Sequence, residues 1–363
     1  MTESCDACLR RAHLIAHLAP RIAGLLGRRR PALAGLLGLP EDELILATAG
    51  RARAEAFAFR DAFDPRPARE RLVEQGVLAI CRHHGCYPPL LEELSDAPAV
   101  LFAAGRPETL ETIAREPAVA IVGTRNPSSY GTEVAHALGR GLGSAGVPIV
   151  SGLALGIDAT AHRGCLEGGG VPVAVLACGP DLAYPRRHRS LHDRVREHGV
   201  VLSELPPGTE PFRWSFPARN RIMAGLARMT IVVEAAQPSG SLITSDFARD
   251  LGRSVAAVPG RVTSNRARGS NALIRDGAVP ILQTADVLDE LFGAGVRPVL
   301  ARAGPDDPGL LAVLEAAESS SSIAAIAGAT GLDTGSVRAA LGRLEAAGHL
   351  VRAELGGWER TAW

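Results

Sequence analysis

The hydrophobic positions of the chain follow a different pattern in each of three segments. In residues 1–66, short apolar stretches recur at helical spacing and are interrupted by Pro and Gly. This pattern predicts a small domain of short helices that ends near the DPRPARE stretch at 64–70. The expected helices span residues 9–18, 21–26, 31–37, 41–48 and 51–63.

The second segment, residues 67–292, repeats a short apolar run, a Gly-rich loop and a helical stretch. The runs are rich in β-branched residues, and their alternation with helices predicts an α/β fold. We expect a Rossmann-like, doubly wound, mostly parallel sheet with helices on both faces, and ligands beyond the carboxyl ends of its strands. The expected strands span residues 118–122, 147–150, 171–177, 200–202, 229–233, 255–258 and 279–282.

The third segment begins with an expected linker at 293–308. Helices are predicted at 310–317, 323–329 and 336–347, followed by two short strands around ELGGWER. This order is typical of a winged-helix domain, which we assign to 309–363. The domain has four arginines against six acidic residues. That balance disfavours tight duplex binding, so a winged-helix transcription regulator is a weaker alternative function.

The charged residues narrow the possible chemistry. The chain has 363 residues and no lysine, so its 39 basic residues are all arginines, balanced by 39 acidic ones. A Walker-type phosphate loop or a lysine nucleophile is therefore excluded. Because the net charge is zero, any polyanion must bind a local cluster of arginines. No apolar run approaches about 18 residues, so we expect a cytoplasmic protein without a membrane partner.

Basic and small polar residues follow several of the expected strands, in loops that should converge at one edge of the sheet. Backbone N–H groups at a helix start and the fork of an arginine both bind phosphate oxygens. Several such groups together suit a chain of phosphates, and Tyr184 and Trp214 could stack on bases. The predicted contacts are Gly123, Thr124, Arg125, Ser151, Gly152, Arg186, Arg219, Asn220, Arg221, Ser239, Gly240 and Ser241.

Motifs for common enzymes are missing from these loops. No GxGxxG follows the first strand of the repeat, and no GxSxG occupies a strand–helix turn, which excludes NAD binding and the α/β-hydrolase type. Asp158 and His162 are four residues apart, but without a visible third partner we interpret them as structural. The loop PSGSLITSD is placed like the PGGxGTxxE loop of lysine-decarboxylase-like phosphoribohydrolases, with Asp246 near the expected Glu. A phosphoribohydrolase acting on nucleoside monophosphates is therefore the second alternative function, beside the transcription regulator.

Six cysteines are too few and too scattered for a disulfide scaffold. CDAC at 5–8 and CRHHGC at 81–86 could be two halves of a zinc site. They are distant in sequence and belong to different predicted domains, so we predict neither a metal site nor a cofactor.

Six ordered blocks between about 77 and 290 resemble the DprA/Smf family of DNA-processing proteins. They are VAIVGTRNPSSYG, SGLALGIDATAH, AVLACGPDLAYP, SELPPGTEPFRWSFPARNRIMAGL, VVEAAQPSGSLITSDFA and VAAVPGRVTSNRARGSNALIRDGA.

This resemblance implies an extended Rossmann core that binds single-stranded DNA, usually as a homodimer, with a SAM-like helical domain before it and a winged helix after it. It implies a non-enzymatic mediator that protects incoming strands and helps load the recombinase RecA during natural transformation. By motif position, the resemblance implies that Arg125 is the family's strand-binding arginine and Arg186 the basic residue after its YP motif. It places the family's RNR block at Arg219, Asn220 and Arg221. The chain departs from the family pattern at Ala177–Cys178 and at His188, where the family has Asn.

Overall fold

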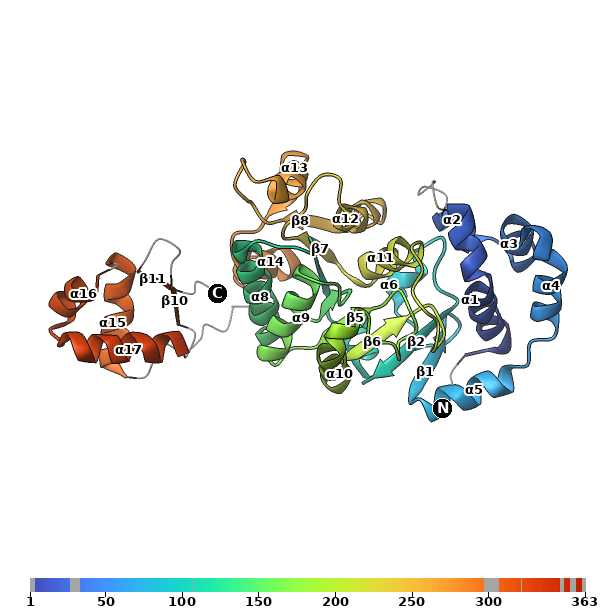
Figure 1. Cartoon of the computed structure of the whole chain (residues 1–363), viewed down its shortest axis with the longest axis horizontal. Helices are drawn as coiled ribbons and strands as arrows, with labels where there is room; N and C mark the ends of the chain where they lie inside the picture. The colour runs from blue at the N-terminus through green and yellow to red at the C-terminus, as the bar shows by residue number, and fades with distance from the viewer. Residues whose placement is uncertain are drawn as a thin grey trace. The chain divides into compact units, whose positions relative to one another are not determined.

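The computed structural model describes residues 4–26, 33–106, 108–296, 307–320, 322–346, 349–352 and 357–360. The chain forms two compact units, residues 1–299 and 300–363 (Figure 1). Most of the linker predicted at 293–308 lies outside the described residues. In the described part of the chain, no helix has the length and apolar character needed to cross a bilayer.

A nine-stranded sheet forms the centre of the larger unit, with the strand order β1-β2-β6-β5-β4-β3-β7-β8-β9. From β6 to β9 every neighbouring pair is parallel, which confirms the predicted mostly parallel Rossmann-like sheet. The strands are β1 (Val77–Cys81), β2 (Val100–Gly105), β3 (Val119–Val122), β4 (Ile149–Ser151), β5 (Pro172–Val175), β6 (Val200–Ser203), β7 (Met229–Val232), β8 (Ser254–Ala257) and β9 (Val279–Pro280).

The strands β1 and β2 were not predicted from the sequence; they pair antiparallel with each other, and β2 pairs antiparallel with β6. They do not belong to the strand–loop–helix repeat from which the other strands were predicted. Both are almost entirely buried, because each side of the sheet is covered by helices.

Helices cover both faces of the sheet and create two apolar cores. One core lies between the sheet and α7, α11 and α13, and the other between the sheet and α1, α5, α9 and α10. The helices of these layers are α1 (Asp6–Leu26), α5 (Pro65–Glu74), α6 (Pro89–Glu92), α7 (Glu108–Arg115), α8 (Ser129–Ser144), α9 (Ile157–Glu167), α10 (Arg189–His198), α11 (Ser215–Leu226), α12 (Gly240–Asp250), α13 (Arg268–Arg275) and α14 (Thr284–Phe292).

The helices α1 and α5 share an apolar core with the sheet, while the later part of α1 packs with the three α-helices that follow it in a separate core. The boundary expected at 66/67 falls inside α5, which Asp64 caps by accepting the Arg66 N–H at 3.0 Å. The helix α1 is continuous through Pro20, although two helices were predicted, because one of its faces is buried from Cys8 to Ile22, on both sides of the proline. The remaining helices here are α2 (Leu33–Gly38), α3 (Glu41–Thr48) and α4 (Arg53–Asp61), beside the β1 edge in Figure 1.

Trp214 belongs to this packing and is not a free stacking surface. Its side chain is buried between α1 and the loop before α11, and its indole N–H donates to the Ala19 carbonyl at 3.0 Å. The prediction that it stacks on bases was therefore wrong. A large apolar ring with one donor is better satisfied in this core than in solvent.

The smaller unit contains α15 (Pro308–Ser319), α16 (Ile323–Thr330), α17 (Thr334–Ala346), β10 (Leu350–Arg352) and β11 (Trp358–Arg360). Its two strands pair antiparallel. Three helices followed by a β-hairpin agree with the predicted order of elements, while the winged-helix assignment stays a prediction.

Candidate functional site

A cavity of about 1300 Å³ opens at the carboxyl ends of the central strands, where a parallel sheet is expected to bind its ligand. Its walls come from the loop after β3, the stretch 211–217, one side of α11 and the first turn of α12. Eight predicted contact residues line it: Gly123, Thr124, Arg125, Arg219, Asn220, Ser239, Gly240 and Ser241. The other four, Ser151, Gly152, Arg186 and Arg221, are not among the lining residues.

The N-terminus of α12 faces this cavity. Ser239 caps the helix by accepting the Ser241 N–H at 3.4 Å, and Asn220 donates its side-chain amide to the Gly240 carbonyl at 3.2 Å. No atom lies near the position of a Cβ on Gly240, and the buried Thr244 hydroxyl has no hydrogen-bond partner among the described residues. The partial positive charge of a helix start is therefore available to an anion.

The protein's own carboxylates lie near the starts of two neighbouring helices, α8 and α9. Glu234 accepts the backbone N–H of Ser128 at 2.8 Å and its hydroxyl at 2.6 Å, at the beginning of α8. Asp158, in the first turn of α9, accepts the Gly152 N–H at 3.1 Å. The predicted anion site at the loop after β3 is corrected here, because Thr124 donates its N–H to the Glu234 carbonyl at 2.7 Å.

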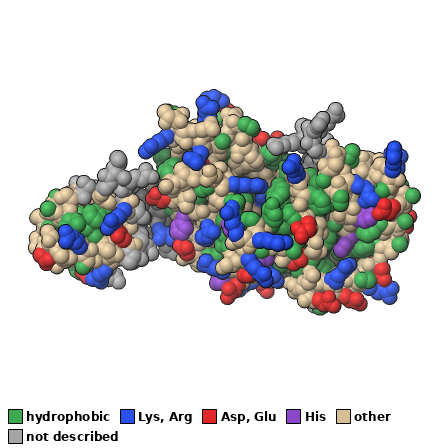
Figure 2. All heavy atoms as spheres, viewed as in Figure 1, with side chains coloured by type: hydrophobic (Ala, Val, Ile, Leu, Met, Phe, Trp, Pro, Cys, Tyr) green, Lys and Arg blue, Asp and Glu red, His purple; other side chains and the backbone are tan. Residues whose placement is uncertain are grey.

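Three arginines line the cavity and give it positive charge. Arg125 and Arg213 are exposed, and the Arg125 guanidinium lies 5.3 Å from the ring centre of Phe216. Figure 2 shows basic side chains over the middle of the larger unit, with hydrophobic side chains beside them. Phe212, Arg213 and Phe216 also line the cavity, although they were not predicted from the sequence. Their signal was the alternation of aromatic and basic residues in PFRWSFPARNR.

The third arginine, Arg219, lies buried at the base of the cavity. Its guanidinium donates to the Val175 carbonyl at 2.7 Å, and burial lowers its pKa although the Asp158 carboxylate raises it. Arginine stays charged despite such a shift. A Cβ on Gly152 would overlap this guanidinium, so Gly152 makes room for Arg219.

Ser151, next to Gly152 in the chain, also has a structural role. The Ser151 hydroxyl is buried and donates to the Ile121 carbonyl at 2.6 Å. Ser151 and Gly152 therefore pack behind the residues at the base of the cavity and do not form its surface.

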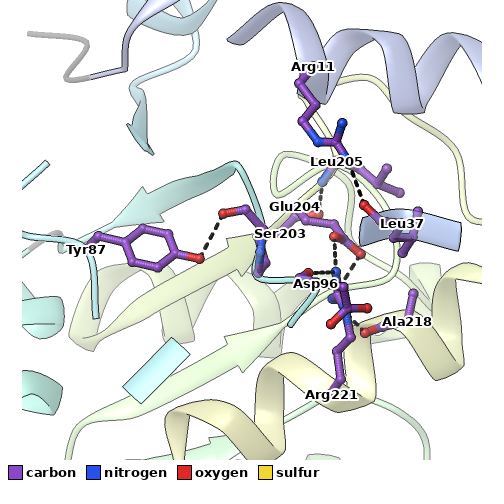
Figure 3. A network of polar contacts seen from close by, with 10 residues as sticks. Arg11, Leu37, Tyr87, Asp96, Ser203, Glu204, Leu205, Ala218 and Arg221 are labelled. Atoms are coloured by element: carbon purple, nitrogen blue, oxygen red, sulfur yellow. Dashed lines mark hydrogen bonds and ion pairs between the residues drawn. The ribbon is translucent and has the colours of Figure 1, made fainter. Parts of the chain in front are cut away.

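The structure contradicts the interpretation of Arg221 as a phosphate clamp. Its side chain is fully buried and pairs with Asp96 at 2.7 Å and with Glu204 at 2.8 Å. Figure 3 shows both carboxylates converging on the guanidinium. Burial opposes its charge, but Glu204 and Asp96 raise the pKa of Arg221 above its usual range. Residues two apart on a helix differ by about 200° in direction, so Arg219 and Arg221 cannot face the same ligand.

Arg186 is exposed in a short 3-10 helix, Arg186–His188, outside the cavity lining. Tyr184, half-exposed, lies 5.7 Å from Phe216 between ring centres, so the loop reaches the aromatic side of the cavity. His188, which departs from the family pattern, is buried, and its Nδ1 lies 2.9 Å from the Leu153 carbonyl.

Asp158 and His162 do not form an accessible catalytic pair. His162 is completely buried, and Asp158 bonds to the loop backbone. Burial raises the pKa of Asp158, while Arg219 lowers it. Asp246, the residue expected near a catalytic Glu in a phosphoribohydrolase, is exposed 3.8 Å from Arg249 and is not among the cavity-lining residues.

The fold and the cavity define a Rossmann-like α/β protein with a basic, aromatic-lined site for an anionic ligand. Residues 78–292 match the family model of DNA recombination-mediator protein A, and the chain belongs to this family. The comparisons favour neither the phosphoribohydrolase nor the transcription regulator.

Curated relatives agree with this assignment. Over 214 residues the chain is 42% identical to protein Smf of Synechocystis, covering 59% of this chain and 53% of that protein. Over 252 residues it is 39% identical to DNA processing protein DprA of Bacillus subtilis, covering 68% of this chain and 84% of that protein. The chain thus spans about half the length of the Synechocystis relative.

Two solved structures share the fold. DprA of Streptococcus pneumoniae superposes with a TM-score of 0.62 at 33% identity, covering 78% of this chain and 96% of that one. A structure of DNA processing protein A from Helicobacter pylori, described for its single-stranded DNA binding mode, superposes with a TM-score of 0.53 at 28% identity. The match covers 59% of this chain and 95% of that one.

The buried His162 predicts a loss of stability in acid. Burial lowers its pKa from 6.5 to about 3, and the Ser151 backbone offsets only part of this. Below pH 6.5 the unfolded chain therefore binds a proton that the folded chain does not. The contribution of neutral His162 to the free energy of unfolding is complete above pH 6.5 and falls by about 2 kcal/mol between pH 7 and 5.

The measurement is urea unfolding at several pH values. The free energy of unfolding of His162→Leu should depend correspondingly less on pH, and that of His198→Leu, at an exposed position, should keep the wild-type dependence. An equal pH dependence in wild type and His162→Leu would contradict this.

The buried ion pairs predict a large effect of Arg221→Met. The substitution leaves two buried carboxylates without a counter-charge, so the free energy of unfolding should fall by about 3–5 kcal/mol in urea denaturation. Adding Asp96→Asn and Glu204→Gln should recover part of the loss. Arg115→Ala, which removes an exposed pair with Glu111 at 3.7 Å, should change stability by less than about 1 kcal/mol. A similarly small loss for Arg221→Met would contradict the network.

Proposed function

We propose that the cavity binds single-stranded DNA, and that the protein is a non-enzymatic mediator that protects incoming strands and helps load RecA during natural transformation. The observation that carries this proposal is the open N-terminus of α12, which shares one cavity with Arg125, Arg213 and Arg219. A helix start and several guanidiniums together suit successive phosphates of one strand.

The aromatic residues support an unpaired strand as the ligand. Phe212 and Phe216 line the cavity, and Tyr184 lies beside Phe216. Unpaired bases can enter a concave site and stack on such rings irrespective of sequence, whereas the bases of a duplex are already stacked on each other. The single-stranded DNA binding mode described for the Helicobacter pylori relative agrees with this choice.

The positions of the polar residues support a binding role without catalysis. His162 is fully buried, and Asp158, the one carboxylate among the described lining residues, is 5% exposed and accepts the Gly152 N–H at 3.1 Å. The lining also includes arginines, small hydroxyl residues and aromatic rings, and these groups bind and orient a polyanion. Homodimer formation, the RecA contact and a cytoplasmic location remain predictions that accompany this proposal.

The test is a salt titration of oligothymidylate binding. Arg125→Ala and Arg213→Ala should each weaken binding about tenfold or more, because each removes a charge-assisted contact worth about 1.5–3 kcal/mol. Each should also reduce the slope of log affinity against log salt by about 0.7. Phe216→Ala should weaken binding through lost stacking, at about 1–3 kcal/mol per base, and change the slope less.

Arg275→Ala is the matched control, since this exposed arginine pairs with Asp276 at 3.1 Å and is not among the cavity-lining residues. It should leave both affinity and slope unchanged. Unaltered binding by Arg125→Ala and Arg213→Ala, or release of base from nucleoside monophosphates by the wild-type protein, would overturn the proposal.

A further inference from the structure

A second cluster of reactive side chains lies away from the cavity, where the start of α1 meets the end of β1. The thiols of Cys5, Cys8 and Cys81 and the imidazole of His83 place their ligand atoms within 4.8 Å of one another. No disulfide links these cysteines. Three sulfurs and one nitrogen at such distances are the donor set of a tetrahedral zinc site.

The distances between the donor atoms agree with one ion at the centre of the cluster. His83 Nδ1 lies 3.6 Å from Cys5 Sγ and 3.4 Å from Cys8 Sγ. A tetrahedral ion with Zn–S of about 2.3 Å and Zn–N of about 2.0–2.1 Å requires an S···N separation of about 3.5 Å. The protein therefore already holds these donors near the spacing that zinc would impose.

Local structure explains how the four donors meet. The Cys5 carbonyl accepts the Leu9 N–H at 3.0 Å, which begins α1 and places Cys5 and Cys8 one turn apart on the same side. Cys81 ends β1, and the backbone turns directly after it, with the His84 N–H donating to the Cys81 carbonyl at 2.9 Å. This turn lets His83 return toward the Cys81 thiol.

We propose that Cys5, Cys8, Cys81 and His83 bind one structural Zn²⁺ ion that fastens the N-terminal helix to the edge of the sheet. Three soft thiolates and one imidazole favour zinc over calcium or magnesium, which take oxygen ligands. Because all four positions are filled by protein, the site is of the closed, structural kind.

The surroundings suit a permanently bound ion. Cys8 and Cys81 are buried in the apolar core that joins α1 to the sheet, whereas Cys5 and His83 are exposed and leave a path for the metal to enter. Arg69 holds the same N-terminal turn by pairing with Asp6 at 2.6 Å and donating to the Ser4 carbonyl at 2.8 Å. The ligands on α1 are thus positioned partly by contacts that need no metal.

The structure also corrects the residues that spacing alone had suggested. CRHHGC pairs Cys81 with Cys86, but Cys86 is not in the cluster, and its N–H donates to His84 Nδ1 at 3.2 Å. The two cysteine-containing segments are not separated in space, because α1 and β1 pack in one core. Cys86 and His84 are therefore natural controls for Cys81 and His83.

The test is metal analysis of the full chain, expressed in zinc-supplemented medium and purified by gel filtration under reducing conditions. Wild-type protein should carry about one zinc per chain. Cys5→Ser and His83→Ala, both at exposed positions, should lose most of the zinc, and Cys86→Ser and His84→Ala should retain it. Cobalt reconstitution should give the strong visible absorption of tetrahedral thiolate coordination in wild type, Cys86→Ser and His84→Ala.

Removing zinc with a chelator should also lower the melting temperature of the wild type and leave that of Cys5→Ser nearly unchanged. Wild-type protein that neither carries zinc nor takes up cobalt would overturn the proposal. So would an equal loss of zinc in Cys86→Ser and Cys5→Ser, or a disulfide among Cys5, Cys8 and Cys81 in the reduced preparation. The oligothymidylate titration is a separate measurement, so either proposal can fail without the other.

Discussion

The buried charge of Arg221 is the constraint on which the site depends. Asp96 and Glu204 hold its guanidinium on one side of α11, and this fixes the rotation of the helix about its own axis. With that rotation set, Arg219 and Asn220 point the other way, toward the strand ends and the first turn of α12. A buried ion pair is costly to break on one side only, so the orientation of α11 is well specified.

A second constraint is the distribution of the protein's own carboxylates at the carboxyl edge of the sheet. Glu234 satisfies the start of α8, and Asp158 lies in the first turn of α9 beside Arg219, so both regions are neutralised from within. The start of α12 has only hydroxyl groups and remains free to attract an anion. Positive charge is thus concentrated at one place in a chain whose charges balance overall.

The N-terminal helices complete the larger unit. The start of α1, together with α5, packs against β1 and β2, and the rest of α1 packs with α2, α3 and α4 in a second core. Trp214 belongs to this second core, so it joins α1 to the stretch 211–217, which forms a wall of the cavity. The proposed zinc ion would fasten the opposite end of α1 to β1. The N-terminal helices therefore support one wall of the cavity.

The sequence by itself determined the parallel sheet, the edge at which its loops gather, the Ser-Gly-Ser start of α12 and the exclusion of lysine chemistry. These features depend on local periodicity and on which residue types are present, and both can be read along the chain. Only the tertiary structure decided that Arg219 faces the cavity while Arg221 is buried, and that His83 joins the cysteine cluster while Cys86 does not. The physical reason is that the deciding partners are remote: Asp96 is 125 positions from Arg221, and His83 is 78 from Cys5. No local pattern encodes such pairings, because they exist only after the chain has packed.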